Sequence, residues 1–190
     1  MSKLRTANLL GALSGEVVGR LERRLKGHPN ATDSAVAALN VLGFWDGCSN
    51  AELARVLGLS HPATVRLVDK LEAAGLAEAR PGRDRRAVAL HLTEAGRTRM
   101  RAVLTDRCVA LAEVTEALTP AEQDQLAGLL EKLLRGAVTS PERAGHICRL
   151  CDEIACPEAE CPVHLAAMEM SGAGASPQVG DSIPGHDDHY

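Results

Sequence analysis

The stretch that decides the fold is residues 49–92, which read SNAELARVLGLSHPATVRLVDKLEAAGLAEARPGRDRRAVALHL. A first short helix begins after Ser49, because the side chains of Ser49 and Glu52 can each bond the backbone N–H of the other residue in a capping box. Gly58 ends this helix, since glycine takes the left-handed C-terminal conformation without strain. The tight turn that follows places Leu59 as an apolar plug between this helix and the next.

A second helix is predicted to start at Ser60, which we expect to act as its cap, and to end at Gly75. Pro62 is tolerated in the first helical turn, where the missing N–H is not needed. The side chains expected to face inward lie at helical spacing: Thr64, Leu67, Val68 and Leu71. The side chains left facing outward are Pro62, Ala63, Val65, Arg66 and Lys70.

A basic hairpin is predicted next, with strands from Leu76 to Arg80 and from Ala87 to Leu92 around a turn at residues 81–84. Four arginines cluster there: Arg80, Arg83, Arg85 and Arg86. A merely solvated hairpin is the alternative, but contact with phosphates and the minor groove is favoured directly after such a helix. Two short helices, a tight turn and a basic hairpin form the outline of a winged helix-turn-helix, a module that reads DNA.

The segments LGLSHPATVRLVDKLEAAGL and PGRDRRAVALHLTEAG resemble the multiple-antibiotic-resistance regulator (MarR) family, and the resemblance extends roughly from Leu4 to Ala137. It implies a dimeric bacterial transcription factor whose first and last helices join two protomers. It also implies that Asp84 orients a neighbouring arginine. Thr64 departs from the family pattern, which usually has an aliphatic residue at that position.

Composition and charge are consistent with a helical DNA-binding chain. Of the 190 residues, 45% are apolar but only 2% are aromatic, so the core must be built from Leu, Val and Ala, which favours helices. The net charge is −4, yet residues 49–101 hold 10 Lys and Arg against 6 Asp and Glu. A basic island on an acidic chain is the expected footprint of a DNA-reading face.

The sequence predicts a cytoplasmic location. Its apolar runs do not approach the roughly 20 residues of a membrane helix. Charged residues interrupt the N-terminal apolar stretch, whereas a signal peptide has an uninterrupted apolar region there. In a reducing compartment, the six cysteines do not suggest a disulfide framework.

Long helices are predicted on both sides of the hairpin module, from Leu4 to Lys26, Thr32 to Phe44, Thr93 to about Leu118, and Thr119 to Gly136. The first carries an apolar stripe: Leu10, Leu13, Val17, Leu21 and Leu25. The last carries a second stripe: Leu126, Leu129, Leu130, Leu133 and Leu134. Packing within the chain is one explanation, and a dimer interface is the favoured one, because a lone winged module leaves these stripes little to cover.

A cysteine-rich segment follows, with the spacing C-x2-C-x4-C-x4-C formed by Cys148, Cys151, Cys156 and Cys161. The segment contains too few apolar residues to make a core, so we expect a metal site. Zinc takes four thiolates in a tetrahedron, and the spacing is similar to that of zinc knuckles, with cysteine in place of histidine. An iron–sulfur cluster is the main alternative, because Cys-Pro recurs near such clusters. The remaining alternative is that the four cysteines form disulfides or stay as free thiols.

The sequence thus predicts a mainly α chain in three parts: a winged helix-turn-helix and dimerisation domain (1–137), a metal-binding segment (138–170) and a disordered tail (171–190). Its function is predicted to be that of a homodimeric repressor bound to a double-stranded DNA operator, with a small-molecule effector and a response to metal or redox state left open. Arg66 is the best candidate for reading a base, and shape and methyl contacts are expected from His61, Pro62, Ala63 and Val65. Phosphate contacts are expected from Ser60, Lys70, Arg80, Arg83, Arg85 and Arg86.

Two other functions compete with this prediction. A thiol oxidoreductase would use Cys148 and Cys151, but the βαβ pattern typical of such enzymes is missing and two further cysteines complete a metal set. The expectation is therefore that the chain is not an enzyme. The other function is an adaptor that docks onto another protein through the cysteine segment, which is compatible with DNA binding.

Overall fold

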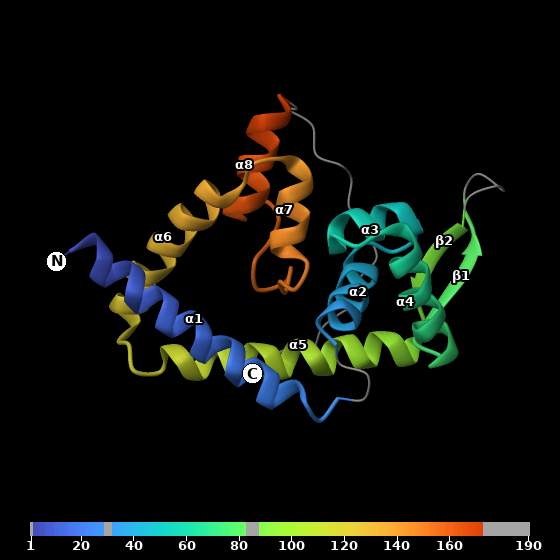
Figure 1. Cartoon of the computed structure of the whole chain (residues 1–190), viewed down its shortest axis with the longest axis horizontal. Coiled ribbons are helices and arrows are strands. Elements are labelled where there is room, and N and C mark those ends of the chain that lie inside the picture. Colours follow the sequence, from blue (N-terminus) through green and yellow to red (C-terminus); the bar gives the residue numbers. More distant parts are fainter. Residues whose placement is uncertain (1, 29–31, 83–87, 173–190) are drawn as a thin grey trace.

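The computed structural model describes residues 2–28, 32–82 and 88–172 (Figure 1). Its elements are α1 (Lys3–Leu25), α2 (Asp33–Phe44), α3 (Asn50–Leu57), α4 (His61–Ala73), β1 (Ala77–Pro81), β2 (Val88–Leu92), α5 (Glu94–Thr115), α6 (Pro120–Ala137), α7 (Pro141–Cys148) and α8 (Pro162–Ser171). The predicted mainly helical fold with a two-stranded sheet is confirmed. Among the predicted elements, the largest difference is at the end of α5, which stops at Thr115 rather than Leu118.

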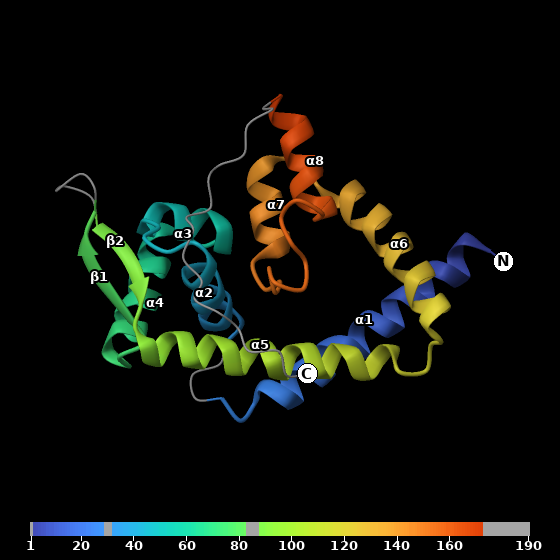
Figure 2. The same cartoon turned by 180° about the vertical axis from the view of Figure 1, so that it is seen from behind.

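The long helix α5 runs along the molecule (Figures 1 and 2). One of its ends carries α4 and the two strands, and the other leads into α6, with α1 packed across it. The carboxylate of Asp106 on α5 accepts hydrogen bonds from Arg24 Nε at 3.0 Å and from His28 Nε2 at 2.8 Å. These bonds, together with the charges of both partners, lower the pKa of Asp106.

The main core is built around α2, in which every residue from Ala35 to Leu42 is buried. A helix that is apolar on all sides is stable only when other elements surround it. Here α3, α4, α5 and β2 do so, and Leu42 and Leu53 have no exposed surface. The winged module is therefore folded over α2.

The caps around α3 form as predicted. The backbone N–H of Glu52 donates to Ser49 Oγ at 3.3 Å, and the N–H of Ser49 donates to the Glu52 carboxylate at 2.8 Å. Gly58 has a φ of +66°, the left-handed conformation that favours glycine. Leu59 packs against the main core. The tight turn between α3 and α4 is thus determined by local chemistry.

Helix α4 buries three of the four side chains expected to face inward, Thr64, Val68 and Leu71, while Leu67 is half-buried against the core. Thr64 is 0% exposed, and its hydroxyl donates to the carbonyl oxygen of Ser60 at 3.2 Å. Because this bond satisfies the buried hydroxyl, threonine packs inward at a position where the resembled family has an aliphatic residue.

The strands β1 and β2 pair antiparallel, in a register that runs from Ala77 opposite Leu92 to Pro81 opposite Val88. Leu90 and Leu92 are buried beneath the hairpin. An isolated bridge joins Leu90 to Cys48, with Leu90 N–H donating to the Cys48 carbonyl at 2.9 Å. The hairpin is therefore attached to the segment between α2 and α3 as well as to its own partner strand.

The start of α5 passes so close to Leu76, the residue before β1, that Gly96 has no room for a side chain. A Cβ there would lie 1.9 Å from the carbonyl oxygen of Leu76, which is fixed backbone. We expect Gly96→Ala to lower the free energy of unfolding by about 1–3 kcal/mol, the usual cost of overpacking, in a chemical denaturation series. Gly136→Ala is the control, because open space surrounds Gly136 and the change should be neutral or stabilising. Equal stability of the Gly96→Ala variant and the wild type would contradict the close contact.

Helices α1 and α6 bury none of their residues. Large apolar side chains stay exposed on both, including Leu10 at 51%, Leu13 at 46%, Leu129 at 62% and Leu133 at 59%. Two apolar helices that a single chain leaves uncovered are typical of an interface between protomers. None of the described helices is both long enough and apolar enough to span a bilayer.

The cysteine-rich segment contains two helices that the sequence did not predict, α7 and α8. The expectation that this segment is too poor in apolar residues to form a core was wrong. A small second core forms from Val138, Ala144, Cys161, Val163 and Ala166. Cys148 and Cys156 pack against it as small apolar side chains, a role that thiols fill well.

Candidate nucleic-acid interface and cysteine cluster

The outward side of α4 presents the residues predicted to read bases. His61, Pro62 and Arg66 are exposed, whereas Ala63 and Val65 are half-buried. Lys70 is exposed one turn beyond Arg66 and continues the same helix surface. α4 therefore offers long basic side chains to a partner while its opposite side is fixed in the core.

Ser60 occupies the N-cap position of α4 but its side chain makes no capping hydrogen bond, so the predicted capping role is corrected. The carbonyl oxygen of Ser60 instead accepts a hydrogen bond from the hydroxyl of Thr64. Pro62 lies within the first turn and needs no backbone acceptor there. Ser60 is exposed, which leaves its hydroxyl at the helix N-terminus, where anions are favoured.

The hairpin carries Arg80 on β1, where its guanidinium pairs with the carboxylate of Glu78. Arg83, Arg85 and Arg86 lie outside the described residues, as does Asp84. A residue that the sequence reasoning missed, Glu72 on α4, accepts a hydrogen bond from the N–H of Ala79 at 2.8 Å. This bond ties α4 to β1, and no pattern in the sequence indicated it.

The four clustered cysteines are brought together by the ends of α7 and α8. Cys148 Sγ and Cys161 Sγ lie 3.9 Å apart. The pKa of the Cys151 thiol is lowered to about 7, chiefly because its thiolate accepts a hydrogen bond from Cys148, and the pKa of Cys148 is raised by the same contact. Burial raises the pKa of Cys156 to about 11. In the part of the chain that the structure describes, no three His, Cys, Asp or Glu side chains already meet in the arrangement of a bound metal ion.

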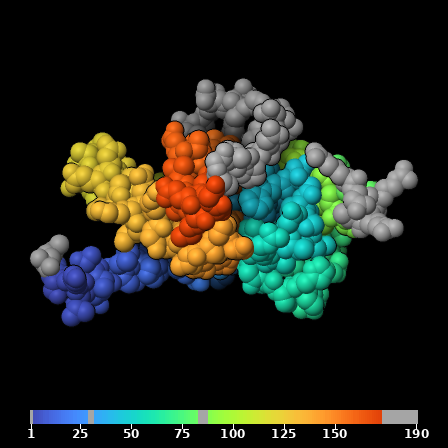
Figure 3. Space-filling model, turned by 90° about the horizontal axis from the view of Figure 1, so that it is seen from above, coloured from blue at the N-terminus to red at the C-terminus, as the bar shows by residue number. Residues whose placement is uncertain are grey.

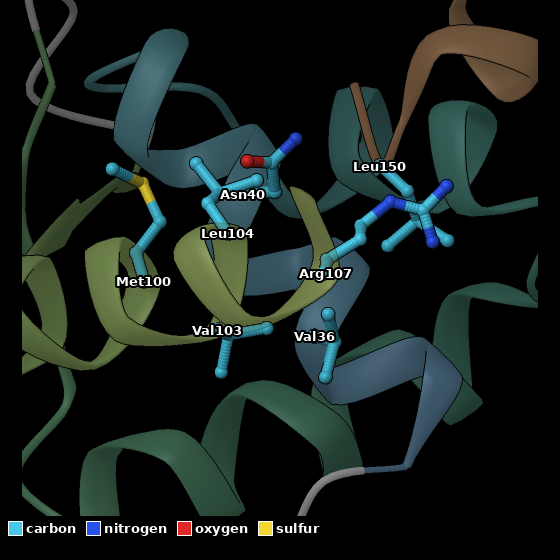
Figure 4. A pocket seen from close by; sticks show the side chains of 7 residues that line it. All are labelled: Val36, Asn40, Met100, Val103, Leu104, Arg107 and Leu150. Carbon is cyan, nitrogen blue, oxygen red and sulfur yellow. The ribbon is translucent and has the colours of Figure 1, made fainter. Parts of the chain in front are cut away.

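A narrow hollow lies between α2, α5 and the cysteine segment (Figure 4). Its lining consists of Val36, Asn40, Met100, Val103, Leu104, Arg107 and Leu150. The hollow is too narrow to hold a water molecule. Leu150, which lies between Cys148 and Cys151 in the sequence, thus packs against the main core beside α2.

Asn40 is a second residue that the sequence reasoning missed. It is 4% exposed, and its Nδ2 donates to the carbonyl oxygens of Arg149 at 3.2 Å and Cys151 at 2.8 Å. The sequence does indicate that Asn40 has hydrogen-bond partners, since a lone amide in the apolar run of α2 must find them when it is buried. Its partners lie more than 100 residues away along the chain, so the sequence could not name them.

Comparisons with known proteins agree with this geometry. Residues 31–87 match the family model described as MarR family. The transcriptional repressor MprA of Escherichia coli is 39% identical over 85 residues, which cover 44% of this chain and 48% of MprA. The chain thus spans about half the length of the curated relatives it matches.

Solved structures show the same fold over a longer stretch. MarR of E. coli in its apo form is 25% identical, with a TM-score of 0.57, and the match covers 67% of this chain and 96% of MarR. The Mycobacterium tuberculosis MarR family protein Rv2887, solved in complex with DNA, is 27% identical with a TM-score of 0.56, covering 67% of this chain and 95% of that one. Residues 31–87 are thus similar in sequence to the MarR family model, and the described part of the chain is similar in fold to solved MarR family members.

Proposed function

We propose that the chain is a homodimeric, sequence-specific DNA-binding regulator that represses transcription from a double-stranded operator in the cytoplasm. The observation that carries the proposal is the exposed side of α4, where Arg66 and Lys70 face outward from a rigid winged module. A relative of the same fold is solved in complex with DNA, and another is named a transcriptional repressor.

The charge distribution supports the same function. Residues 49–101, with 10 Lys and Arg against 6 Asp and Glu, contain the whole winged module, and the remainder of the chain is acidic. Contacts between cationic side chains and phosphates supply most of the affinity and fix the register on the duplex, but they do not read sequence. We assign this role to Ser60, Lys70, Arg80, Arg83, Arg85 and Arg86.

Base recognition is assigned to the N-terminal half of α4. In helix-turn-helix proteins this part of the second helix enters the major groove. Arg66 has the donors for a two-bond contact with guanine, while His61, Pro62, Ala63 and Val65 supply shape and methyl contacts. The hairpin then lies beside the groove, where Arg80 exchanges its Glu78 partner for a phosphate.

The homodimer is inferred from the uncovered leucines of α1 and α6. A two-fold axis through these helices would present two copies of α4 to successive major grooves, about 34 Å apart on B-form DNA. Operators of such dimers are near-palindromic, so a selected sequence should show two inverted half-sites.

Selection from random double-stranded DNA with the purified chain tests the proposal. Enrichment of an inverted repeat, bound about 10³- to 10⁷-fold more tightly than unrelated DNA, is the expected result. Transcription in vitro from a promoter that overlaps this repeat should fall when the chain is added. Failure to enrich any sequence would contradict the proposal.

Lys70→Ala should weaken binding to all sequences alike and reduce the slope of log affinity against log salt by about 1 per protomer, because one phosphate contact is lost. Titrations at several salt concentrations measure this slope. Lys26→Ala is the matched control, since Lys26 is an exposed lysine at the end of α1, away from α4. A slope unchanged by Lys70→Ala would remove Lys70 from the interface.

A further inference from the structure

Four cysteines fall within the segment 148–161. The two at its ends, Cys148 and Cys161, are in contact through their Sγ atoms. In a tetrahedral site with Zn–S distances of about 2.3 Å, neighbouring sulfurs are about 3.8 Å apart. The 3.9 Å between Cys148 Sγ and Cys161 Sγ already matches that edge, so the two helix ends that carry these residues are at the correct separation.

Short hydrogen-bonded turns deliver the other two thiols. The N–H of Cys151 donates to the carbonyl of Cys148 at 2.8 Å, and the N–H of Cys156 donates to that of Asp152 at 2.9 Å. A metal ion would have to draw the sulfurs of Cys151 and Cys156 to this pair by side-chain rotation and shifts of these turns. All four are free thiols in the structure.

Two histidines flank the cysteines, and each uses its Nδ1 in a contact: His146 with the carbonyl oxygen of Val56 at 3.1 Å, and His164 with the carboxylate of Glu158 at 3.0 Å. The four thiols make a complete tetrahedral donor set without them.

The cluster lies at a joint between two parts of the molecule. On one side, Asn40 of α2 holds the turn between Cys148 and Cys151 through both of its amide hydrogens, and His146 of α7 contacts α3. On the other side, α8 packs on α6, and Arg135 pairs with Glu169. The views in Figures 1 and 3 show α7 and α8 between α3 and α6.

We propose that Cys148, Cys151, Cys156 and Cys161 bind one zinc ion, and that this zinc site clamps the DNA-binding module to α6. With the clamp loaded, the two copies of α4 in a dimer are held at a fixed separation. Without zinc, α7 and α8 are held less tightly, so the separation of the two α4 helices varies over a wider range. Operator DNA then binds only those dimers whose separation matches its half-sites. The second half of the proposal rests on the proposed function, whereas the zinc site itself does not.

Metal content tests the site directly. The full chain, purified under anaerobic conditions, should hold about one zinc per chain and show no visible absorbance. Cys161→Ser should lose most of this zinc, while Cys108→Ser, a cysteine outside the cluster, should keep it. Iron with a visible absorbance that bleaches in air would overturn the choice of zinc. A chain that holds neither metal, and whose four thiols react freely in the native state, would overturn the site.

Reactivity and proteolysis provide a second measurement. Burial raises the pKa of Cys48 to about 12, so Cys48 gives a slow background with thiol reagents. Zinc removal by a chelator should make the thiols of the cluster accessible to the reagent and permit trypsin to cut after Arg149, which lies between two ligands. Added zinc should restore protection. Identical cleavage with and without zinc would contradict the clamp.

Operator binding tests the coupling. We expect zinc removal to weaken operator binding by about 5- to 150-fold, the usual range for coupling between two sites. Asn40→Leu keeps the volume but removes both amide donors, so its operator affinity should depend less on zinc than that of the wild type. Equal affinity of zinc-loaded and zinc-free wild type would overturn the clamp and leave the zinc site standing. If the chain selects no operator at all, the proposed function fails, and zinc content together with trypsin protection still decides the site.

Discussion

Leu133→Glu should convert a dimer into a monomer that no longer holds its operator. Leu133 is 59% exposed in the single chain, so the substitution leaves the fold of the protomer intact. Burying a leucine contributes about 1.5–3 kcal/mol, and a two-fold interface contains each residue twice, so about 3–6 kcal/mol of dimer stability is lost. Light scattering at micromolar concentration measures the mass, and operator titration measures the affinity.

A substitution at Leu133 tests dimerisation better than one at Leu21. Because Leu21 is half-buried, a change there would also alter the stability of the protomer. Gln125→Glu is the matched control, because it adds the same charge to α6 outside the leucine stripe. A wild type that is monomeric at micromolar concentration, or a Leu133→Glu variant that stays dimeric, would refute the inferred interface.

Arg66→Ala should relax the sequence preference of the protein as well as weaken binding. A two-bond contact between arginine and guanine contributes about 1–3 kcal/mol of discrimination per half-site, and the dimer makes the contact twice. The measurement is competition between the selected operator and a version with the contacted guanine replaced in both half-sites. Wild type should discriminate between the two, and Arg66→Ala should not.

Arg66→Lys separates base reading from phosphate binding, because lysine keeps the charge but cannot form the planar pair of bonds. Arg23→Ala, on the exposed surface of α1, controls for the loss of one positive charge. If Arg66→Lys keeps the full discrimination, Arg66 holds a phosphate and another residue of α4 reads the base.

The parts of the fold that could be predicted are those set by neighbours in the sequence. Ser49, Glu52 and Gly58 determine both ends of α3 within ten residues, and the structure agrees. Ser60 shows where this reasoning fails: its position was right, but its side chain does not cap, because a residue type indicates a preference and not a bond. The exposed side of α4 followed from helical periodicity alone, once Thr64 and Val68 were placed inward.

The cysteine segment could not be predicted in the same way. The cysteine spacing indicates metal ligands, but it does not indicate that Cys161 and Val163 belong to the same buried core. Helices as short as α7 have little intrinsic stability, so their existence depends on tertiary packing rather than on a long periodic pattern. Asn40 depends on partners far along the chain, and local patterns contain no information about such pairs.

The bridge between Cys48 and Leu90 keeps the hairpin ordered before any ligand binds. An isolated two-stranded hairpin is marginally stable in water, and ordering it on contact with a ligand would subtract from the affinity. Here the backbone bonds to Cys48 and the Glu72 contact to Ala79 fix both strands to the same body as α4. In the proposed DNA complex, α4 and the two strands would therefore meet the duplex as one preorganised surface.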